Sequence, residues 1–487
     1  MQKEHNKEWI YLLLLSMAAI VVSFSCHSFG LLNELPERDS SVFQYIADEM
    51  IKGKMPYLDT FDHKGPLIYL FNVAGKLLSD TYGLWFIELL ALAATLFLCY
   101  FIARLCAGSF ASMTAGLLCA LSLCPFLQSG NLVEEYAMPF IAYSIYVYLA
   151  YFKYRKTSAL QLLLCGCCFG AVLMLRPNMI AVWIVGCLAV VIDCLWDHKT
   201  KKLPGFIALF AVGILIVIIP FLIWLYMGGA LQDFWKDYIL FNLSYKESKS
   251  SLFNIAKVIA YFILNFGCLM ALFSMILAIR KKHSICHFMV LGFFVVSFAL
   301  MGISGRLYAH YAMVIIPVLA YPFAYISTYI TDFTEKNKKK VEIVVSVILL
   351  IGGMTASIDP VKKIIREVLP VQSSWKEKYP EEAAVVSEIQ HFSDEYDKIT
   401  VYGNHDAYYL LSGRDSASKY SYQKPLVYVD KRIKTWYFKD LQESMPAVIV
   451  WCNYNASDRA QKDSMYQFII ENHYIQSDKV KTVFYRN

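Results

Sequence analysis

Residues 205–226 read GFIALFAVGILIVIIPFLIWLY, a run without a single charged side chain. A helix of about 20 apolar residues is long enough to cross the hydrocarbon core of a bilayer. Runs of this kind recur along the chain, and together they predict an α-helical polytopic membrane protein. We expect about eleven transmembrane helices, at residues 9–29, 82–103, 110–127, 136–152, 159–175, 178–195, 205–226, 254–279, 286–304, 308–330 and 341–357.

The composition excludes a water-soluble globular protein. Of the 487 residues, 57% are hydrophobic and only 17% are charged, whereas soluble domains carry about 25% charged residues. The net charge of +6 is small for this length, and the Lys and Arg residues gather in short loops. This charge therefore reports membrane topology and implies no nucleic-acid partner.

The Lys and Arg clusters fall in alternate loops between the apolar runs. Short loops rich in these residues stay in the cytoplasm, so we expect a cytoplasmic N-terminus and an extracytoplasmic, or periplasmic, tail. The first run is expected to remain as a signal-anchor of a multi-pass protein of the cytoplasmic (inner) membrane. The clusters are Lys3 with Lys7, Arg104, Lys153 with Arg155 and Lys156, Lys199 with Lys201 and Lys202, residues 280–282, and Lys336 with residues 338–340.

Two further segments lie between and after the spans. The first outer loop, residues 30–81, contains helical patterns at 40–52 and 66–79 that are too short or too polar to span, so we expect them to lie on the membrane surface. After residue 357 the composition becomes that of a small soluble α/β unit. We therefore expect a transmembrane domain at 1–357 and an extracytoplasmic α/β accessory domain at 358–487, with strands at 398–402 and 446–451 and helices at 406–411 and 463–472.

Asp39 is the first candidate catalytic residue. It follows the first span by a few residues, so it should lie near the membrane surface, where a carboxylate can act as general base on an acceptor hydroxyl or amine. The alternative is structural, because Asp39 or Ser40 could be the N-cap of the helix at 40–52. The two roles do not exclude each other.

A second polar cluster precedes the helix that begins at Pro66. Lys64 could bind a phosphate as a point charge. Asp59, Asp62 and His63 could orient an acceptor or supply ligands to a divalent metal, although their spacing matches no firm metal signature. The alternative interpretation is a solvated turn.

Two later elements place charge at the outer ends of spans. Glu134 and Glu135 begin a helix, where they could orient the acceptor or bind a metal, or simply interact favourably with the helix dipole. Arg176 and Arg306 could clamp an anionic lipid phosphate, or could extend toward lipid headgroups from an apolar surface. Tyr308 and His310 share the turn of Arg306 and join it in the candidate donor-phosphate site.

The order of these motifs resembles bacterial GT-C-type integral-membrane glycosyltransferases. More narrowly, it is similar to the family 39-like group that joins protein O-mannosyltransferases with lipid A aminoarabinose transferases. The likeness covers most of residues 8–330. It rests on Arg38-Asp39-Ser40, residues 53–59 leading into Asp62-His63-Lys64-Gly65-Pro66, Asn131 with Glu134-Glu135, Arg176-Pro177, and Gly305-Arg306 with His310-Tyr311.

The resemblance implies transfer of a sugar, with inversion, from a polyprenyl-monophosphate carrier to a lipid, glycan or protein acceptor on the non-cytoplasmic face. It also implies that Asp39 deprotonates the acceptor, that Lys64 lies near the carrier phosphate, and that Glu134 or Glu135 is the second acidic position. His63 before Lys64 and Gly65 after it depart from the aminoarabinose-type pattern, which has an acid there and no glycine.

Two other functions fit a polytopic chain. A transporter or flippase of lipid-linked glycans usually has polar residues near the membrane midplane, whereas here they gather at the ends of the spans. A polymerase or ligase of surface polysaccharide would also transfer sugar at the outer face, but from a diphosphate-linked glycan. The resemblance favours the monophosphate donor.

Overall fold

The computed structural model describes residues 2–198, 200–244, 252–264, 266–282, 284–303, 306, 308–331, 337–359, 361–362, 374–454 and 462–486. The chain forms two compact units, and each is described by itself. The helical unit comprises Met1–Cys26, Gly83–Leu222 and Lys246–Pro370; the mixed unit comprises His27–Tyr82, Ile223–Tyr245 and Val371–Asn487. Lys199, Ser304, Gly305, Leu307 and Lys336, which the sequence singled out, lie outside the described residues.

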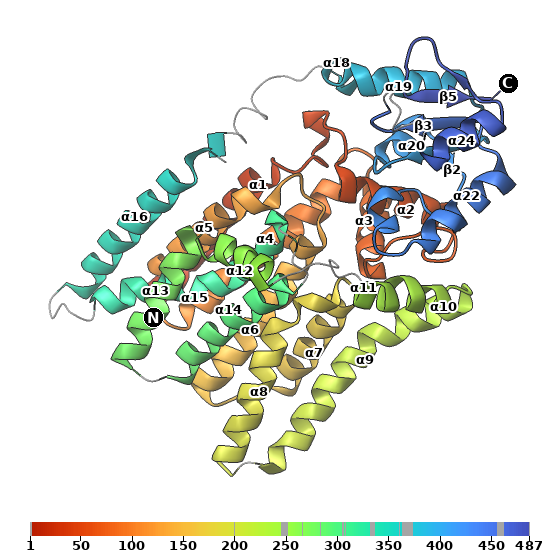
Figure 1. The fold of residues 1–487 in the computed structure, drawn as a ribbon. Coiled ribbons are helices and arrows are strands. Elements are labelled where there is room, and N and C mark those ends of the chain that lie inside the picture. Colours follow the sequence, from red (N-terminus) through yellow and green to blue (C-terminus); the bar gives the residue numbers. More distant parts are fainter. Residues whose placement is uncertain are drawn as a thin grey trace. The chain divides into compact units, whose positions relative to one another are not determined.

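Helices, most of them long, and short 3₁₀ turns make up the helical unit (Figure 1). They are α1 (Gln2–Ser23), α4 (Gly83–Arg104), α5 (Ser109–Leu127), α6 (Val133–Tyr154), α7 (Ala159–Leu173), η2 (Pro177–Met179), α8 (Ala181–Trp196), η3 (Thr200–Lys202), α9 (Leu203–Met227), α12 (Leu252–Ile263), α13 (Phe266–Lys281), α14 (Ile285–Gly302), η5 (Ala309–Ile315), α15 (Ile316–Thr331) and α16 (Lys338–Ala356).

Each of the eleven apolar runs is helical, which agrees with a multi-pass membrane protein. The run at 254–279 is broken into α12 and α13, and the run at 308–330 begins with the 3₁₀ turn η5. Within the described residues, five helices are long and apolar enough to cross a membrane, or six if the bent pair α12 and α13 counts as one span. The five are Gly83–Arg104, Ser109–Leu127, Thr200–Met227, Ile285–Gly302 and Ala309–Thr331.

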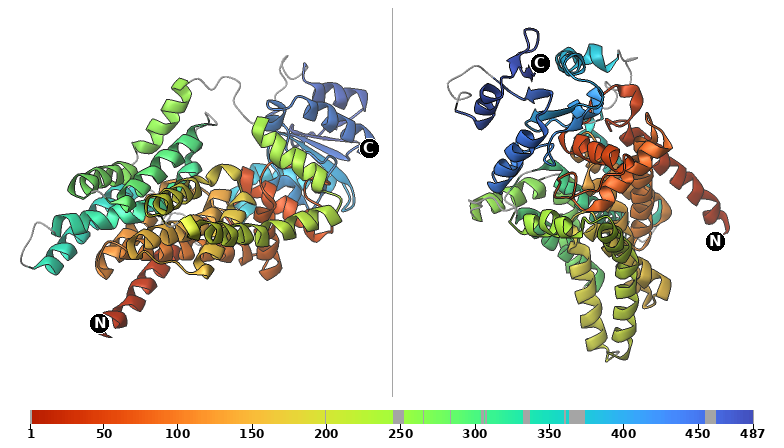
Figure 2. Two further views of the ribbon diagram at one scale, coloured as in Figure 1. Left: turned by 90° about the horizontal axis from the view of Figure 1, so that it is seen from below. Right: turned by 90° about the vertical axis from the view of Figure 1, so that its right-hand side faces the viewer.

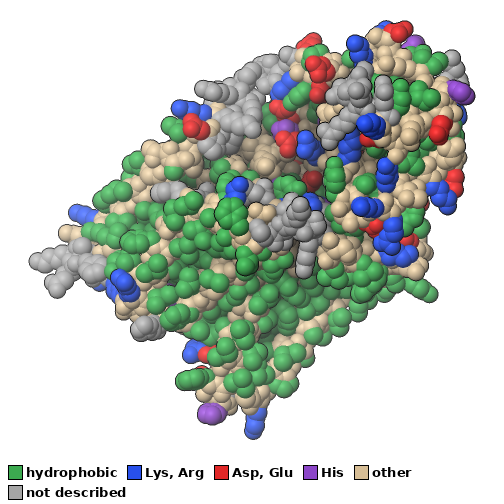
Figure 3. All heavy atoms as spheres, in the orientation of Figure 1, with side chains coloured by type: hydrophobic (Ala, Val, Ile, Leu, Met, Phe, Trp, Pro, Cys, Tyr) green, Lys and Arg blue, Asp and Glu red, His purple; other side chains and the backbone are tan. Residues whose placement is uncertain are grey.

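Small residues bring α7 and α9 together. A Cβ atom on Gly166 would overlap the Phe210 carbonyl oxygen, and one on Gly213 would overlap the Leu163 carbonyl oxygen. Glycines that allow two backbones to approach closely are a common device where membrane helices pack. Beyond this contact, α9 exposes a continuous apolar surface (Figure 3), as expected for a helix that faces lipid. Figure 2 shows α8 and α9 as an antiparallel pair that extends to the same side from the turn at η3.

The mixed unit combines short helices with a sheet. It contains η1 (Gly30–Leu32), α2 (Arg38–Ile51), α3 (Pro66–Leu78), α10 (Leu231–Phe234), the π-helical turn η4 (Trp235–Leu240), α11 (Phe241–Ser244), α18 (Trp375–Lys378), α19 (Pro380–His391), β1 (Lys398–Tyr402), α20 (Ala407–Ser412), β2 (Asp415–Ser416), α21 (Lys424–Val427), α22 (Arg432–Ser444), β3 (Val448–Trp451), α24 (Ser464–Glu471), β4 (Ile475–Gln476) and β5 (Val483–Tyr485).

The five strands have the order β2-β1-β3-β5-β4. β1 is parallel to β2 and β3, with Ile399 opposite Val448, and β5 is antiparallel to β3 and β4. Both β1 and β3 are buried, as their apolar sequences predict. The strands expected at 398–402 and 446–451 and the helices expected at 406–411 and 463–472 are present as β1, β3, α20 and α24.

Within the mixed unit, the first loop packs with the tail. Tyr45 of α2 lies in the apolar core of the sheet and packs against Tyr409, with tilted rings whose centroids are 4.9 Å apart. The backbone N–H of Phe61 donates to the Lys419 carbonyl oxygen at 2.9 Å. These contacts join the loop and the tail into one unit.

Candidate functional site

Asp39 lies in the first turn of α2 and is partly exposed. The N-cap of this helix is Glu37, without a side-chain cap hydrogen bond, and the Ser40 hydroxyl accepts a hydrogen bond from Gln44 Nε2. Neither Asp39 nor Ser40 is therefore the N-cap. Burial is the main cause of the raised pKa of the Tyr422 hydroxyl, Asp62 adds to it, and the charge of Asp39 makes a smaller contribution.

Asp62, His63 and Lys64 form a buried chain of polar contacts. Asp62 Oδ1 lies 3.3 Å from His63 Nδ1, and His63 Nε2 lies 3.2 Å from Lys64 Nζ. Lys64 Nζ also lies 5.9 Å from the centre of the Phe43 ring. The imidazole therefore links the carboxylate to the ammonium group, and both ring nitrogens are engaged.

The Asp62 carboxylate is fixed by several donors. The hydroxyl of Tyr422 donates at 2.6 Å, that of Tyr69 at 3.0 Å, and the His63 backbone N–H at 2.7 Å. Burial opposes ionisation of Asp62, but the Lys64 ammonium and the hydrogen bonds of His63 and Tyr422 outweigh it, so the pKa of the carboxyl lies well below its usual value. Asp62 is therefore ionised at neutral pH.

Asp406, at the start of α20, is a second buried carboxyl near Asp62. Its side chain accepts a hydrogen bond from the Ser421 hydroxyl, and its Oδ1 has no hydrogen-bond partner among the described residues. Burial and, to a smaller extent, the charge of Asp62 together raise the pKa of Asp406 to about 7, against the opposing effect of the Ser421 hydrogen bond. The two carboxyl groups therefore differ in protonation at neutral pH.

We expect the stability of the wild-type protein to fall between about pH 4 and pH 7 because of Asp406. In this range the folded chain holds a proton that the unfolded chain has lost, and the loss amounts to on the order of 4 kcal/mol from the difference between about 7 and the ordinary 3.8. The Asp406→Asn variant should lack this loss. Thermal melting of the full chain in detergent from pH 4 to pH 8 measures it, and parallel Tm curves for the two proteins would contradict it.

Asp59 does not join this cluster. Its carboxylate accepts a hydrogen bond from the Met55 backbone N–H at 2.7 Å, and its own N–H donates to the Met55 carbonyl oxygen at 2.9 Å. The side chain is exposed and closes a turn, as the structural interpretation of this segment predicts. Within the described residues, Asp59, Asp62 and His63 do not form a set of three converging metal ligands.

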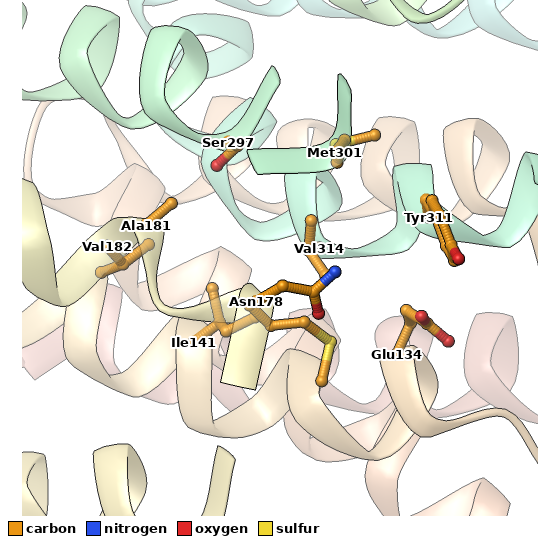
Figure 4. Close-up of a pocket in the computed structure, with 10 residues that line it drawn as sticks. Glu134, Ile141, Asn178, Ala181, Val182, Ser297, Met301, Tyr311 and Val314 are labelled. Carbon is orange, nitrogen blue, oxygen red and sulfur yellow. The ribbon is translucent and has the colours of Figure 1, made fainter. Parts of the chain in front are cut away.

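Glu134 and Arg176 form a buried ion pair in the helical unit. Arg176 Nη1 donates to Glu134 Oε1 at 2.6 Å, and Nη2 donates to the Tyr311 hydroxyl at 2.7 Å. The guanidinium also lies 4.5 Å from the centre of the Tyr311 ring. Figure 4 shows Glu134 and Tyr311 together at one end of a pocket whose cavity of about 20 Å³ could hold one water molecule.

We expect the Glu134→Gln variant to lose about 3–5 kcal/mol of stability, because it leaves the Arg176 cation buried without its carboxylate. The Glu134→Gln/Arg176→Met double variant should recover part of this loss. The melting temperatures of wild type, Glu134→Gln, Arg176→Met and the double variant in detergent form a complete double-mutant cycle. Strictly additive changes would mean that the pair is not coupled.

Tyr308 and His310 lie next to this ion pair through Tyr311. The rings of Tyr308 and His310 stack with centroids 5.5 Å apart, and His310 lies 5.0 Å from the Tyr311 ring. His310 Nδ1 is 2.9 Å from Gln128 Oε1, and Nε of Arg306 is buried. The structure thus gathers Arg176, Tyr308 and His310 around Tyr311.

Glu135 is separated from Glu134 despite its adjacent position. Its Oε2 accepts a long hydrogen bond of 3.5 Å from the Leu132 N–H, and its side chain faces Glu88 and Cys26. The two acids that the sequence could not distinguish therefore have different partners.

Several residues of these clusters were not identified from the sequence. Tyr422 and Asp406 come from the distant tail, Tyr311 from η5, and Asn242 donates to the His63 carbonyl oxygen at 2.6 Å. Tyrosines are common in this chain, 34 in all, so no local signal marks Tyr422, whereas Tyr311 stood in the quoted His310-Tyr311 motif but was not given a role. Asp406 lies four residues after the end of strand β1, at the start of the expected helix 406–411, and was not given a role.

The polar clusters of the two units can each support a particular kind of chemistry. In the mixed unit, a partly exposed carboxylate on α2 can accept a proton, and Lys64 is a cation held by His63 and Asp62. In the helical unit, Arg176 is a planar cation with aromatic neighbours, suited to a phosphate or carboxylate. General-base catalysis and anion binding are the chemistry that these groups support.

Solved structures with similar folds come from membrane glycosyltransferases. ArnT from Cupriavidus metallidurans, bound to undecaprenyl phosphate, has a TM-score of 0.63 and 14% sequence identity, and the match covers 98% of both chains. The archaeal oligosaccharyltransferase AglB from Archaeoglobus fulgidus, in complex with an inhibitory peptide and a dolichol-phosphate, has a TM-score of 0.53 and 11% identity over 99% of this chain and 74% of AglB. The sequence is similar to no curated protein at a significant level.

The structural likeness shows that this chain has the fold of GT-C type glycosyltransferases. A family model described as "Putative competence-induced protein Ccs4 N-terminal domain" matches residues 2–347. Because this match covers well over half of the 487 residues, the chain belongs to the Ccs4 N-terminal domain family.

Proposed function

We propose that this protein is an inverting glycosyltransferase that uses a polyprenyl-monophosphate sugar as donor and a lipid, glycan or protein as acceptor. The observation that carries the proposal is the fold similarity to ArnT bound to undecaprenyl phosphate, which extends over 98% of both chains. AglB, whose structure contains dolichol-phosphate and a peptide, supports the same class of lipid carrier.

In the proposed reaction, Asp39 removes a proton from the acceptor hydroxyl or amine. The acceptor then attacks the anomeric carbon, the bond from that carbon to the phosphate oxygen breaks, and the polyprenyl phosphate leaves as an anion. Lys64 stabilises the charge of the leaving phosphate. Arg176, Arg306, Tyr308 and His310 are proposed to contribute to phosphate binding.

In the proposed topology, the protein crosses the cytoplasmic membrane eleven times and its N-terminus lies in the cytoplasm. Asp39, Asp62 and Lys64 then belong to the non-cytoplasmic face, where a carrier sugar meets its acceptor. The helical segments found at all eleven apolar runs support this arrangement.

The test is sugar transfer by the purified full chain in nanodiscs. Radiolabelled sugars on polyprenyl monophosphate are supplied as a panel, with a membrane extract of the native host as acceptor. We expect labelled acceptor to form together with free polyprenyl phosphate. Transfer only from diphosphate-linked glycans would replace the donor by that of a polymerase or ligase, and the absence of transfer from every donor would overturn the proposal.

A further inference from the structure

Cys26, Glu88 and Glu135 converge in the interior of the helical unit. Cys26 follows α1, whereas Glu88 and Glu135 lie near the starts of α4 and α6. All three side chains have no exposed surface. One potential ligand atom from each, a sulfur and two carboxylate oxygens, lies within 4.8 Å of the other two, and this is the only such group of three in the described part of the chain.

The Glu135 carboxylate gives an independent sign of a missing ligand. Its Oε1 is buried and has no hydrogen-bond partner among the described residues, while Oε2 is only weakly held by the Leu132 N–H at 3.5 Å. Buried polar atoms are normally satisfied, and buried carboxylates are paired or coordinate metals. A cation among these three side chains would satisfy the orphaned oxygen.

The backbone around residue 130 keeps space beside two of the three groups. Gly130 has a φ of +74°, and a Cβ atom there would lie 2.7 Å from Cys26 Sγ and would also overlap Glu88 Oε1. A side chain at this position would therefore fill the place above the sulfur and the carboxylate. The Asn131 backbone N–H donates to Glu88 Oε1, which fixes the orientation of that carboxylate, as contacts around metal ligands commonly do.

We propose that Cys26, Glu88 and Glu135 bind one Zn²⁺ ion. Zinc binds thiolate at about 2.3 Å and carboxylate at about 2.0–2.2 Å, so tetrahedral ligands lie roughly 3.6 Å apart and the side chains need only small movements. The thiolate distinguishes the site from Mg²⁺ and Ca²⁺ sites, which take oxygen ligands. Binding displaces the thiol proton and any carboxyl proton to solvent.

The role of this zinc is structural and does not depend on the proposed transfer reaction. The ion would connect the end of α1 with α4 and with the first turn of α6. Glu134, the partner of Arg176, lies in that same turn. Metal binding therefore fixes the position from which Glu134 reaches Arg176.

The test measures metal directly in the full chain. The protein is purified in detergent through a tag without histidines and without chelators, and its zinc is quantified by inductively coupled plasma mass spectrometry. We expect about one equivalent of zinc in wild type, and at least a tenfold loss of zinc affinity in Cys26→Ser and in Glu135→Gln. Cys165→Ser, which changes another buried thiol of the same unit, should retain the metal.

Cobalt gives a second readout that does not depend on activity or on the stability of the variants. Wild type loaded with Co²⁺ should show a thiolate-to-metal charge-transfer band in the near ultraviolet, and Cys26→Ser should lack it. Wild type that contains no zinc as isolated, and shows no such band after cobalt titration, would overturn the proposal. The same carboxyl groups would then share a proton in place of a metal.

Discussion

The Asp39→Asn variant should lose sugar transfer by a factor of about 10²–10⁴, the usual contribution of a general base. The amide cannot accept the acceptor proton, although it has the same shape as the carboxylate. The fold should be unaffected, because the N-cap of α2 is Glu37 and the described residues place no hydrogen bond on the Asp39 side chain. Initial rates of transfer from the polyprenyl-phosphate donor measure the effect, and melting curves check the fold.

Asp80→Asn is the matched control for this experiment. It makes the same chemical change at an exposed acid of the mixed unit that has no part in the proposed chemistry. Its transfer rate should equal that of wild type. If Asp39→Asn retained a rate within a few-fold of the control, Asp39 would not be the base, and the proton acceptor would have to be sought among other groups.

The Lys64→Met variant should lower the turnover number by about 10²–10³-fold, the typical loss when one preorganised group is removed from a developing anion. The effect should fall on kcat and on the KM for the donor, and it should leave the KM for the acceptor unchanged. Steady-state kinetics with each substrate varied in turn separates these parameters. Lys64→Arg should keep part of the activity because it keeps the positive charge.

A structural role of Lys64 has to be distinguished from this effect, since its ammonium holds the pKa of the buried Asp62 low. Removing Lys64 alone leaves Asp62 as an uncompensated buried charge. The Asp62→Asn/Lys64→Met double variant removes both charges and should melt close to wild type while remaining slow. Recovery of transfer in this double variant would show that Lys64 acts only on folding.

The helices of the apolar runs were predictable because the local sequence of each run is enough to indicate a transmembrane helix. An apolar run such as 205–226 must be helical in lipid, since every backbone polar group has to be satisfied within the segment. The helices α2 and α3 of the first loop were predicted differently, from helical patterns at 40–52 and 66–79 that are too short or too polar to span. The local sequence could not show that the run at 254–279 is interrupted between α12 and α13.

The sequence indicated which residues belong to the candidate site, but it could not indicate which side chains contact one another. Glu134 and Glu135 are residues of the same type, but neighbouring side chains on an α-helix point about 100° apart. Glu134 therefore reaches Arg176, whereas Glu135 lies beside Cys26 and Glu88. Which acid has which partner depends on helix packing. Likewise, nothing local to Asp62 indicates that its hydrogen-bond donor is Tyr422 in the tail.

The mixed unit can be completed only at the end of synthesis, because its three parts are far apart in the chain. Its three parts are His27–Tyr82, Ile223–Tyr245 and Val371–Asn487, and synthesis proceeds from the N-terminus. Asp62 therefore leaves the ribosome long before Tyr422, one of its hydrogen-bond donors, and Tyr45 leaves it long before Tyr409, against which it packs. A nascent chain that lacks about its last hundred residues already contains the hydrophobic helices. The polar cluster around Asp62 is still incomplete in this chain, because Tyr422 has not been made. We therefore expect this cluster to form late, after the helices have entered the membrane.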